Sequence, residues 1–208
     1  MDVQFYGANC LSISNKSTRI VVDDNLTDLG KKSVIKSGDV ALFTNAVPSS
    51  VKDAKIIIDC PGEYEVSDVS IIGIPARAHT DEEGTLKATM FKITTNDLNI
   101  LVTGHVYPEF SESQLESIGM VDVLFVPVGG HGYTLDSKGA LMAIKEIEPK
   151  LVIPTNYEDK SLKYPVPQTS LSEALKEMSM EPKETLTKLK LRSGDLSEVT
   201  QIVVLETV

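Results

Sequence analysis

The run Ala41-Leu-Phe-Thr-Asn-Ala-Val-Pro-Ser-Ser50 passes from apolar to polar residues within a few positions. Its first part belongs to Val40–Thr44, whose apolar and β-branched side chains predict a buried strand. Asn45 and the two serines at the end of the run are typical of turns. Taken alone, the run is a strand end followed by a turn. Its significance depends on the segments around it.

Strand-like and helix-like patterns recur along the whole chain. Strands are predicted at Val3–Tyr6, Leu11–Ser14, Arg19–Val22, Val40–Thr44, Lys55–Asp59, Val66–Ile74, Ala88–Thr94, Asn99–Thr103, Val123–Val126, Leu151–Pro154 and Gln201–Leu205. Helices with one apolar face are predicted at Ser111–Ile118, Ser137–Glu148 and Ser170–Met178. Turn residues separate the elements, for example at Asn96-Asp97. Strands that come first and then alternate with helices indicate a mixed α/β chain.

Length and composition limit the classes of function. A chain of 208 residues and 22.6 kDa is expected to form one domain, residues 1–208. Its formal net charge of −10 argues against a nucleic-acid partner, because phosphate binding requires a basic face. Neither a membrane span nor a leader segment is expected, so the sequence favours a cytoplasmic protein without a membrane partner. Cys10 and Cys60 lack metal or disulfide spacing and are expected to be buried thiols.

Seven further stretches stand in a characteristic order. They are Tyr6-Gly-Ala-Asn-Cys10, Ile20-Val-Val-Asp23, Cys60-Pro-Gly-Glu-Tyr-Glu-Val66, Gly73-Ile-Pro-Ala76 with His79, Val102-Thr-Gly-His105, Val121–Gly130 and Pro149–Tyr157. In this order they resemble the metallo-β-lactamase fold, in the branch similar to L-ascorbate-6-phosphate lactonases and related metal-dependent hydrolases. The resemblance implies a four-layer αββα sandwich.

The family carries a His-x-His-x-Asp-His loop after a strand, and this loop binds zinc. Zinc is held by imidazole nitrogens, thiolates or carboxylates, and it lowers the pKa of its bound water so that hydroxide can attack a substrate. Matching the chain to this loop places Asn45, Val47, Ser49 and Ser50 at the four ligand positions. A valine has no donor atom, and hydroxyl and amide oxygens are poor zinc ligands. The resemblance therefore implies that this loop does not hold zinc in the usual way.

The later ligand positions are altered as well. His79 matches the family's next metal-binding histidine, whereas His105 stands where a Gly-Asp pair supplies the bridging carboxylate. Asn156 replaces the last ligand histidine, and Ala8 replaces a histidine common in this branch. Asp23 matches an early aspartate that holds backbone near the metal loop. No cofactor is expected, although the family uses zinc and a weak single metal at His79 and His105 is the alternative.

These residues support two hypotheses about function. The first is a homologue that has lost most metal ligands and works without catalysis, through a small-molecule ligand or as a homo-oligomer. The alternative is a hydrolase of a small, phosphorylated or unphosphorylated substrate that uses His79 and His105 with one metal or none, so whether the chain is an enzyme stays open. A serine hydrolase built on Ser49 or Ser50 lacks a nucleophile elbow. His131 is expected to be a solvated loop histidine.

Overall fold

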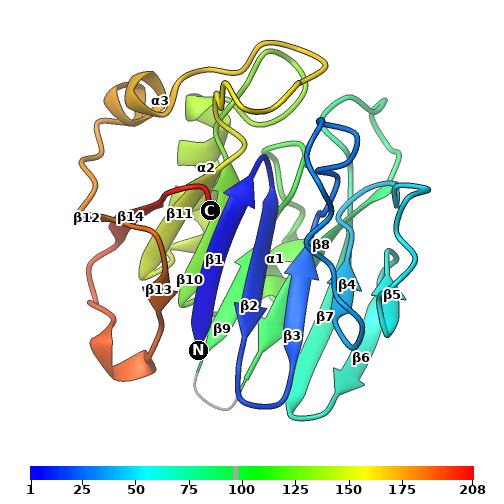
Figure 1. Ribbon diagram of the computed structural model, residues 1–208. Helices are drawn as coiled ribbons and strands as arrows, with labels where there is room; N and C mark the ends of the chain where they lie inside the picture. The colour runs from blue at the N-terminus through cyan, green and yellow to red at the C-terminus, as the bar shows by residue number, and fades with distance from the viewer. Residues whose placement is uncertain (96–97) are drawn as a thin grey trace.

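The computed structural model describes residues 1–95 and 98–208, and two β-sheets packed face to face dominate it (Figure 1). Sheet A has six strands in the order β13-β1-β2-β3-β4-β5. Sheet B has eight strands in the order β12-β14-β11-β10-β9-β8-β7-β6. The turn predicted at Asn96-Asp97 lies outside the described residues.

The elements have the following bounds: β1 Asp2–Gly7, β2 Cys10–Ser14, β3 Arg19–Val22, β4 Val40–Leu42, β5 Ile56–Ile58, β6 Gly62–Val66, β7 Val69–Ala76, β8 Ala88–Thr94, β9 Asn99–Val102, α1 Glu112–Ile118, β10 Val123–Pro127, α2 Ser137–Ile147, β11 Leu151–Thr155, α3 Leu171–Met178, β12 Glu184–Leu186, β13 Leu189–Lys190, the 3₁₀ turn Ser193–Asp195 and β14 Gln201–Leu205. Both sheets are mixed. In sheet A, β1, β2 and β3 pair antiparallel, and β3, β4 and β5 pair parallel. In sheet B, β6 to β9 pair antiparallel, and β9, β10, β11, β14 and β12 pair parallel.

The burial pattern of the strands explains the layers. β1 alternates between buried and partly exposed residues, as expected for a strand with one face on the core. Every residue of β10 is buried, which fits a parallel strand covered on both faces. One apolar cluster, including Phe5, Phe91 and Phe125, fills the space between the sheets. A second cluster lies on the other face of sheet B beneath the helices.

The three predicted helices are confirmed, and all α-helices of the described residues pack on the outer face of sheet B. α1 begins at a capping box, in which the Ser111 side chain accepts from the Gln114 N–H and the Gln114 side chain accepts from the Ser111 N–H. Asp136 caps α2, and Ser170 caps α3. Figure 1 shows α2 and α3 at one end of the sandwich, away from β5 and β6.

The fourth layer, over the outer face of sheet A, is built without helix. A third apolar cluster there joins Cys10 and Val21 of the sheet to Leu26, Leu162 and Tyr164, which lie in two non-helical segments, residues 24–39 and 157–168. Gly30 and Gly38 have φ values of 87° and 96°, which a right-handed helix cannot accommodate. The predicted sandwich is therefore present, and turns take the place of one helical layer.

Two local predictions are wrong. Val66–Ile74 is not one strand, because β6 and β7 form a hairpin in which Val66 pairs with Val69 and Ser67 has a φ of 59°. A Ser-Asp turn lacks the Asn-Gly signal that usually marks such a hairpin. Cys60 is exposed rather than buried. The segment 183–192 contains two short strands that no sequence pattern predicted, of which β12 joins sheet B and β13 joins sheet A.

No helix in the described part of the chain has the length and apolar character needed to cross a membrane.

Candidate functional site

The carboxyl ends of several strands meet at one edge of the sandwich. β1, β3 and β4 end on the same side of sheet A, and β7, β9, β10 and β11 end on the same side of sheet B. The Asn156 N–H donates to the Ala8 carbonyl at 2.7 Å, which joins the end of β11 to the end of β1. Ligands of open α/β sheets bind at such an edge. The predicted positions Ala8, Asn45, His79, His105 and Asn156 all follow these strand ends.

Asp23 fixes the segment after β4. Its carboxylate accepts from the Thr44 N–H and from the Thr44 hydroxyl, both at 2.7 Å, and all of these groups are buried. Burial raises the pKa of Asp23 to about 6, although both hydrogen bonds oppose the rise. Asp23 therefore holds backbone at this edge, which is the role expected from its family position.

Gly104 brings the segment after β9 against Thr44. A Cβ atom on Gly104 would lie 2.2 Å from Thr44 Oγ1, and the glycine has a φ of 65°. Only glycine permits this approach. His105 directly follows Gly104, and Asn45 directly follows Thr44. The segments after β9 and β4 therefore meet through Gly104 and Thr44.

His105 packs against an aromatic ring that the sequence did not single out. The rings of His105 and Tyr133 have centroids 4.8 Å apart at an interplanar angle of 59°. Burial, with a smaller contribution from the nearby His79, lowers the pKa of His105 to about 4. Burial also raises the pKa of Tyr133, and the negative charge of Asp23 adds to that effect. Both side chains are therefore neutral at pH 7.

A backbone hydrogen bond joins His79 to His105. The His79 N–H donates to the His105 carbonyl at 2.8 Å, next to a bridge between Ala78 and Val106. The His79 ring lies 5.9 Å from the ring of Tyr107, on which the Arg77 guanidinium stacks. Burial lowers the pKa of His79. Its ring thus belongs to an aromatic cluster at the edge of the site.

The loop residues Asn45, Ser49 and Ser50 are exposed, and Val47 is partly buried. The Asn45 Oδ1 accepts from the N–H of the following residue, and the Ser50 hydroxyl lies 2.7 Å from the Thr27 hydroxyl. None of the four belongs to the set of residues that lines the cleft around His105. Within residues 1–95 and 98–208, Ser50 is thus the one of the four whose side chain forms a hydrogen bond with a residue distant in sequence, and that residue lies in another loop.

A cleft of about 350 Å³ opens at this edge of the sandwich. Its volume lies within the usual range for small-molecule sites. Its lining contains Ala8, Asn9, Asn25, Asp28, Leu29, His105, Tyr133, Asn156, Lys163, Tyr164 and Pro165. The structure thus brings together three of the predicted positions, namely Ala8, His105 and Asn156. The Asn156 amide is buried and donates from Nδ2 to Gln168 Oε1 at 2.7 Å.

Sequence reasoning missed six polar or aromatic residues of the cleft. They are Asn9, Asn25, Asp28, Tyr133, Lys163 and Tyr164. Asn9 follows Ala8, and Asn25 lies two residues after Asp23. Both asparagines therefore lie next to positions that the family resemblance had already marked as part of the site. Tyr133 follows the glycine-rich loop after β10, and its approach to His105 depends on tertiary packing. Lys163 and Tyr164 belong to the non-helical segment over sheet A, which no sequence pattern placed at the site.

The donor set of the cleft does not fit the zinc site that the fold family implies. Zinc requires imidazole, thiolate or carboxylate ligands arranged around one point. Among residues 1–95 and 98–208, no group of three or more His, Cys, Asp or Glu side chains could hold a metal ion. Of the residues that line the cleft, only His105 and the exposed Asp28 carry such donors.

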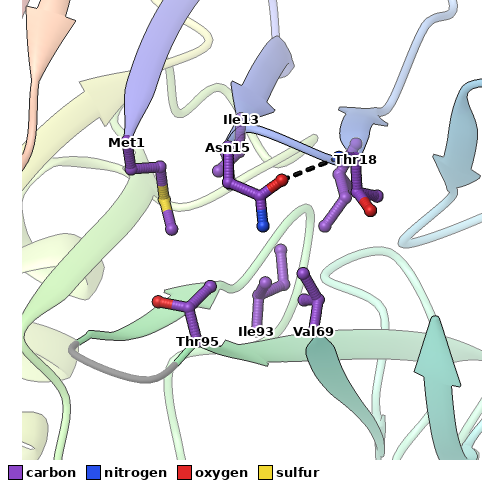
Figure 2. Close-up of a pocket in the computed structure, with 8 residues that line it drawn as sticks. Met1, Ile13, Asn15, Thr18, Val69, Ile93 and Thr95 are labelled. Atoms are coloured by element: carbon purple, nitrogen blue, oxygen red, sulfur yellow. Dashed lines mark hydrogen bonds between the residues drawn. The ribbon is translucent and has the colours of Figure 1, made fainter. Parts of the chain in front are cut away.

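A much smaller cavity lies at the opposite end of the strands. Its volume is about 10 Å³, enough for about one water molecule. Figure 2 shows Met1, Ile13, Asn15 and Thr18 facing Val69, Ile93 and Thr95 across it. The Thr18 N–H donates to Asn15 Oδ1 at 2.7 Å in a local turn. Its size makes it a packing feature rather than a ligand site. His131 is exposed in the loop after β10, as predicted, and does not line the cleft.

Relatives and solved structures agree with this architecture. The family described as "Beta-lactamase superfamily domain" matches residues 2–156, more than half of the chain. A UPF0173 metal-dependent hydrolase of Pyrococcus horikoshii is 28% identical over 142 residues, which cover 64% of this chain and 62% of the relative. A UPF0173 metal-dependent hydrolase of Pyrococcus abyssi matches to the same extent. The chain thus spans less than two thirds of these relatives.

Solved structures match over nearly the whole chain. A protein of the metallo-β-lactamase superfamily from Thermotoga maritima has a TM-score of 0.76 at 24% identity, and the match covers 99% of this chain and 98% of that one. A metallo hydrolase of Ignicoccus hospitalis has a TM-score of 0.65 at 17% identity, covering 99% of this chain and 95% of that one. At these identities the two structures establish the fold. The chain therefore belongs to the β-lactamase superfamily domain family and has the metallo-β-lactamase fold.

Proposed function

We propose that this protein binds a small polar molecule in the His105 cleft without a metal ion and does not hydrolyse it. The main support is the composition of the cleft, in which amide side chains surround a single imidazole. The sequence match predicts a family ligand position at Asn156, and the amide of this residue already bonds to Gln168. Amides donate and accept hydrogen bonds, but they do not activate water as zinc does.

The relatives are named metal-dependent hydrolases, which favours a second candidate, a hydrolase in which His79 and His105 act with one weakly held metal or without a metal. A general base works best when its pKa lies near the working pH. Burial holds the pKa of His105 at about 4, which makes its imidazole a weak base. The ring of Tyr133 also covers one side of the imidazole. Both features favour binding over hydrolysis.

Zinc titration tests the proposal. Thermal unfolding followed with and without a small excess of zinc should show almost no change in Tm, because stabilisation depends on the ratio of free ligand to Kd. The His105→Ala variant is the matched control, since it removes the imidazole of the cleft. A rise of many degrees in the parent that His105→Ala abolishes would overturn the proposal in favour of the hydrolase.

Two further expectations from the sequence remain predictions. The first is self-association as a homo-oligomer, which sedimentation would test. The second is a cytoplasmic location, which cell fractionation would test. Neither is needed for binding in the cleft.

A further inference from the structure

Three residues that line the cleft carry buried polar atoms without partners in the described part of the chain. Asn9 Nδ2, Asn25 Oδ1 and His105 Nδ1 are each shielded from solvent, and none has a hydrogen-bond partner among the described residues. All three side chains belong to the lining of the cleft. Asn9 is only 3% exposed, and its Oδ1 accepts from the Thr155 hydroxyl at 2.8 Å. That bond orients the amide and leaves Nδ2 as an unpaired donor.

The unpaired atoms are of mixed type. Asn9 supplies a donor, Asn25 supplies an acceptor, and a neutral imidazole nitrogen can be either. Hydroxyl groups and amides are the ligand groups that both donate and accept, so they match such a set. A phosphate or a carboxylate at neutral pH offers mainly acceptors and would leave Asn25 Oδ1 unpaired.

The walls of the cleft are apolar rings and aliphatic side chains. Tyr133 and Tyr164 contribute aromatic rings, and Leu29 and Pro165 contribute aliphatic surface. The Tyr164 hydroxyl donates to the Tyr157 carbonyl at 2.9 Å, which fixes its ring in place. Rigid apolar walls around hydrogen-bonding groups suit a compact ring compound.

Charge around the cleft disfavours anions. Asp23 and Asp24 are buried directly after β3, at 4% and 1% exposure. Burial is the main cause of the raised pKa of the Cys10 thiol, the negative charges of Asp24 and Asp23 add to it, and the positive charges of Arg19 and Lys31 oppose it more weakly. At the rim, Lys163 and Asp28 are exposed and carry opposite charges, so they offset each other. The cleft therefore has no net positive charge for a phosphate.

We propose that the cleft takes an uncharged ring compound with several hydroxyl or amide groups, the class of free sugars and nucleosides, and discriminates against its phosphorylated form. This inference rests on the proposed metal-independent cleft. A ligand of this class would pair with the unpaired atoms and pack against the apolar side chains. It would also bring no negative charge near the buried carboxylates.

Matched pairs of probes test the inference in buffer with a metal chelator. The pairs are uridine with uridine 5′-monophosphate, adenosine with adenosine 5′-monophosphate, and ribose with ribose 5-phosphate, each titrated by saturation-transfer NMR and calorimetry. At least one uncharged member should bind, and its phosphorylated partner should bind about tenfold or more weakly. Equal or tighter binding of the phosphorylated member would overturn the inference. Absence of binding by all six probes up to about 10 mM would overturn it as well.

Substitutions of cleft residues test whether the probe binds in the cleft. Asn25→Leu and Asn9→Leu should each weaken binding of the uncharged probe by about tenfold. Gln201→Leu is the control, because this amide lies on β14 and bonds to Lys183 outside the cleft. Binding that survives Asn25→Leu unchanged would overturn the inference even if Asn9→Leu failed to fold. Failure of the inference is distinct from failure of the proposed function, which is tested separately by zinc.

Discussion

Three residues at the strand ends have left-handed backbone conformations, which residues other than glycine rarely adopt. Ala8, Asp23 and Asn156 have φ values of 50°, 47° and 49°. Left-handed conformations are unfavourable for residues other than glycine and persist where surrounding structure fixes them. Here the Asn156 N–H bonds to the Ala8 carbonyl, and Asp23 bonds to Thr44. The backbone of the site is thus fixed by protein contacts.

Gly104→Ala should be strongly destabilising, because its new Cβ would lie 2.2 Å from Thr44 Oγ1. We expect a loss of about 3 kcal/mol or more in the free energy of unfolding. Gly132→Ala is the matched control, since Gly132 has a similar φ of 71° and open space around it. The control should lose about 1 kcal/mol through backbone strain alone. Urea unfolding measures both, and equal losses would contradict the close contact with Thr44.

Asp23→Asn should change how stability depends on pH. The pKa of Asp23 rises from 3.8 to about 6 on folding, so the native state holds a proton that the unfolded state has released. Its contribution to stability is fully present below the unfolded pKa and is lost as pH rises through about 6. Asparagine does not titrate. The variant should therefore gain up to about 3 kcal/mol relative to the parent between about pH 4 and pH 7.

Urea unfolding of both proteins across this pH range measures the effect. His105 has a lowered pKa and acts in the opposite direction, with stability lost as pH falls below its unfolded pKa. Both proteins carry His105, so its contribution cancels in the difference. A difference that does not vary with pH would show that Asp23 ionises normally in the folded protein.

At the residue scale, the sequence predicted which positions follow the strand ends and that Asp23 fixes backbone. It did not predict that the loop side chains at Asn45, Ser49 and Ser50 are exposed. It also did not predict the pairing of His105 with Tyr133, because a contact between residues 28 positions apart depends on how β9 and β10 end side by side. Side-chain direction at a strand end is set by packing rather than by local pattern.

At the element scale, we expect the buried strands to contribute more to stability than the histidines of the site. Leu124 is fully buried in β10 between the helices and the neighbouring strands. Leu124→Ala should cost about 2–5 kcal/mol through the cavity that it leaves. Replacing His79 and His105 together by alanine should cost less, since both residues are partly exposed at the strand ends and belong to neither main apolar cluster. Circular dichroism and urea unfolding compare the two, and a more damaging histidine change would contradict this view.

The segment after β4 allows the family match to be tested by reversal. The changes Asn45→His, Val47→His, Ser49→Asp, Ser50→His, His105→Asp and Asn156→His would restore the family's ligands. If the match is correct, the six-fold variant should bind zinc with a Kd far below that of the parent. The five-fold variant that keeps Val47 should bind more weakly. Calorimetry measures both, and a folded six-fold variant that binds no more zinc than the parent would disprove the match.

Elements were predictable where their pattern was long and their caps were clear. The helices α1 to α3 have such caps at Ser111, Asp136 and Ser170. The β6–β7 hairpin was missed because Ser67 adopts a positive φ without the usual turn sequence. The short strands β12 and β13 have few residues each, and partners far along the chain decide their sheets.

At the scale of the whole molecule, the protein has the metallo-β-lactamase fold, and the cleft at its edge is lined mainly by amide, aromatic and aliphatic side chains. The two main apolar clusters lie between the sheets and under the helices. The cleft lies at one edge and adds little to either cluster. We therefore expect the folded state not to require a metal, because the apolar clusters that stabilise the sheets lie away from the cleft.

The metal content of the purified protein tests this account most directly. The protein should be prepared without chelator and analysed by inductively coupled plasma mass spectrometry, with zinc expressed per chain. We predict far less than one zinc per chain, because the cleft offers His105 and an exposed carboxylate where a zinc site requires a full set of ligands. One tightly held zinc per chain, retained through dialysis, would contradict the account.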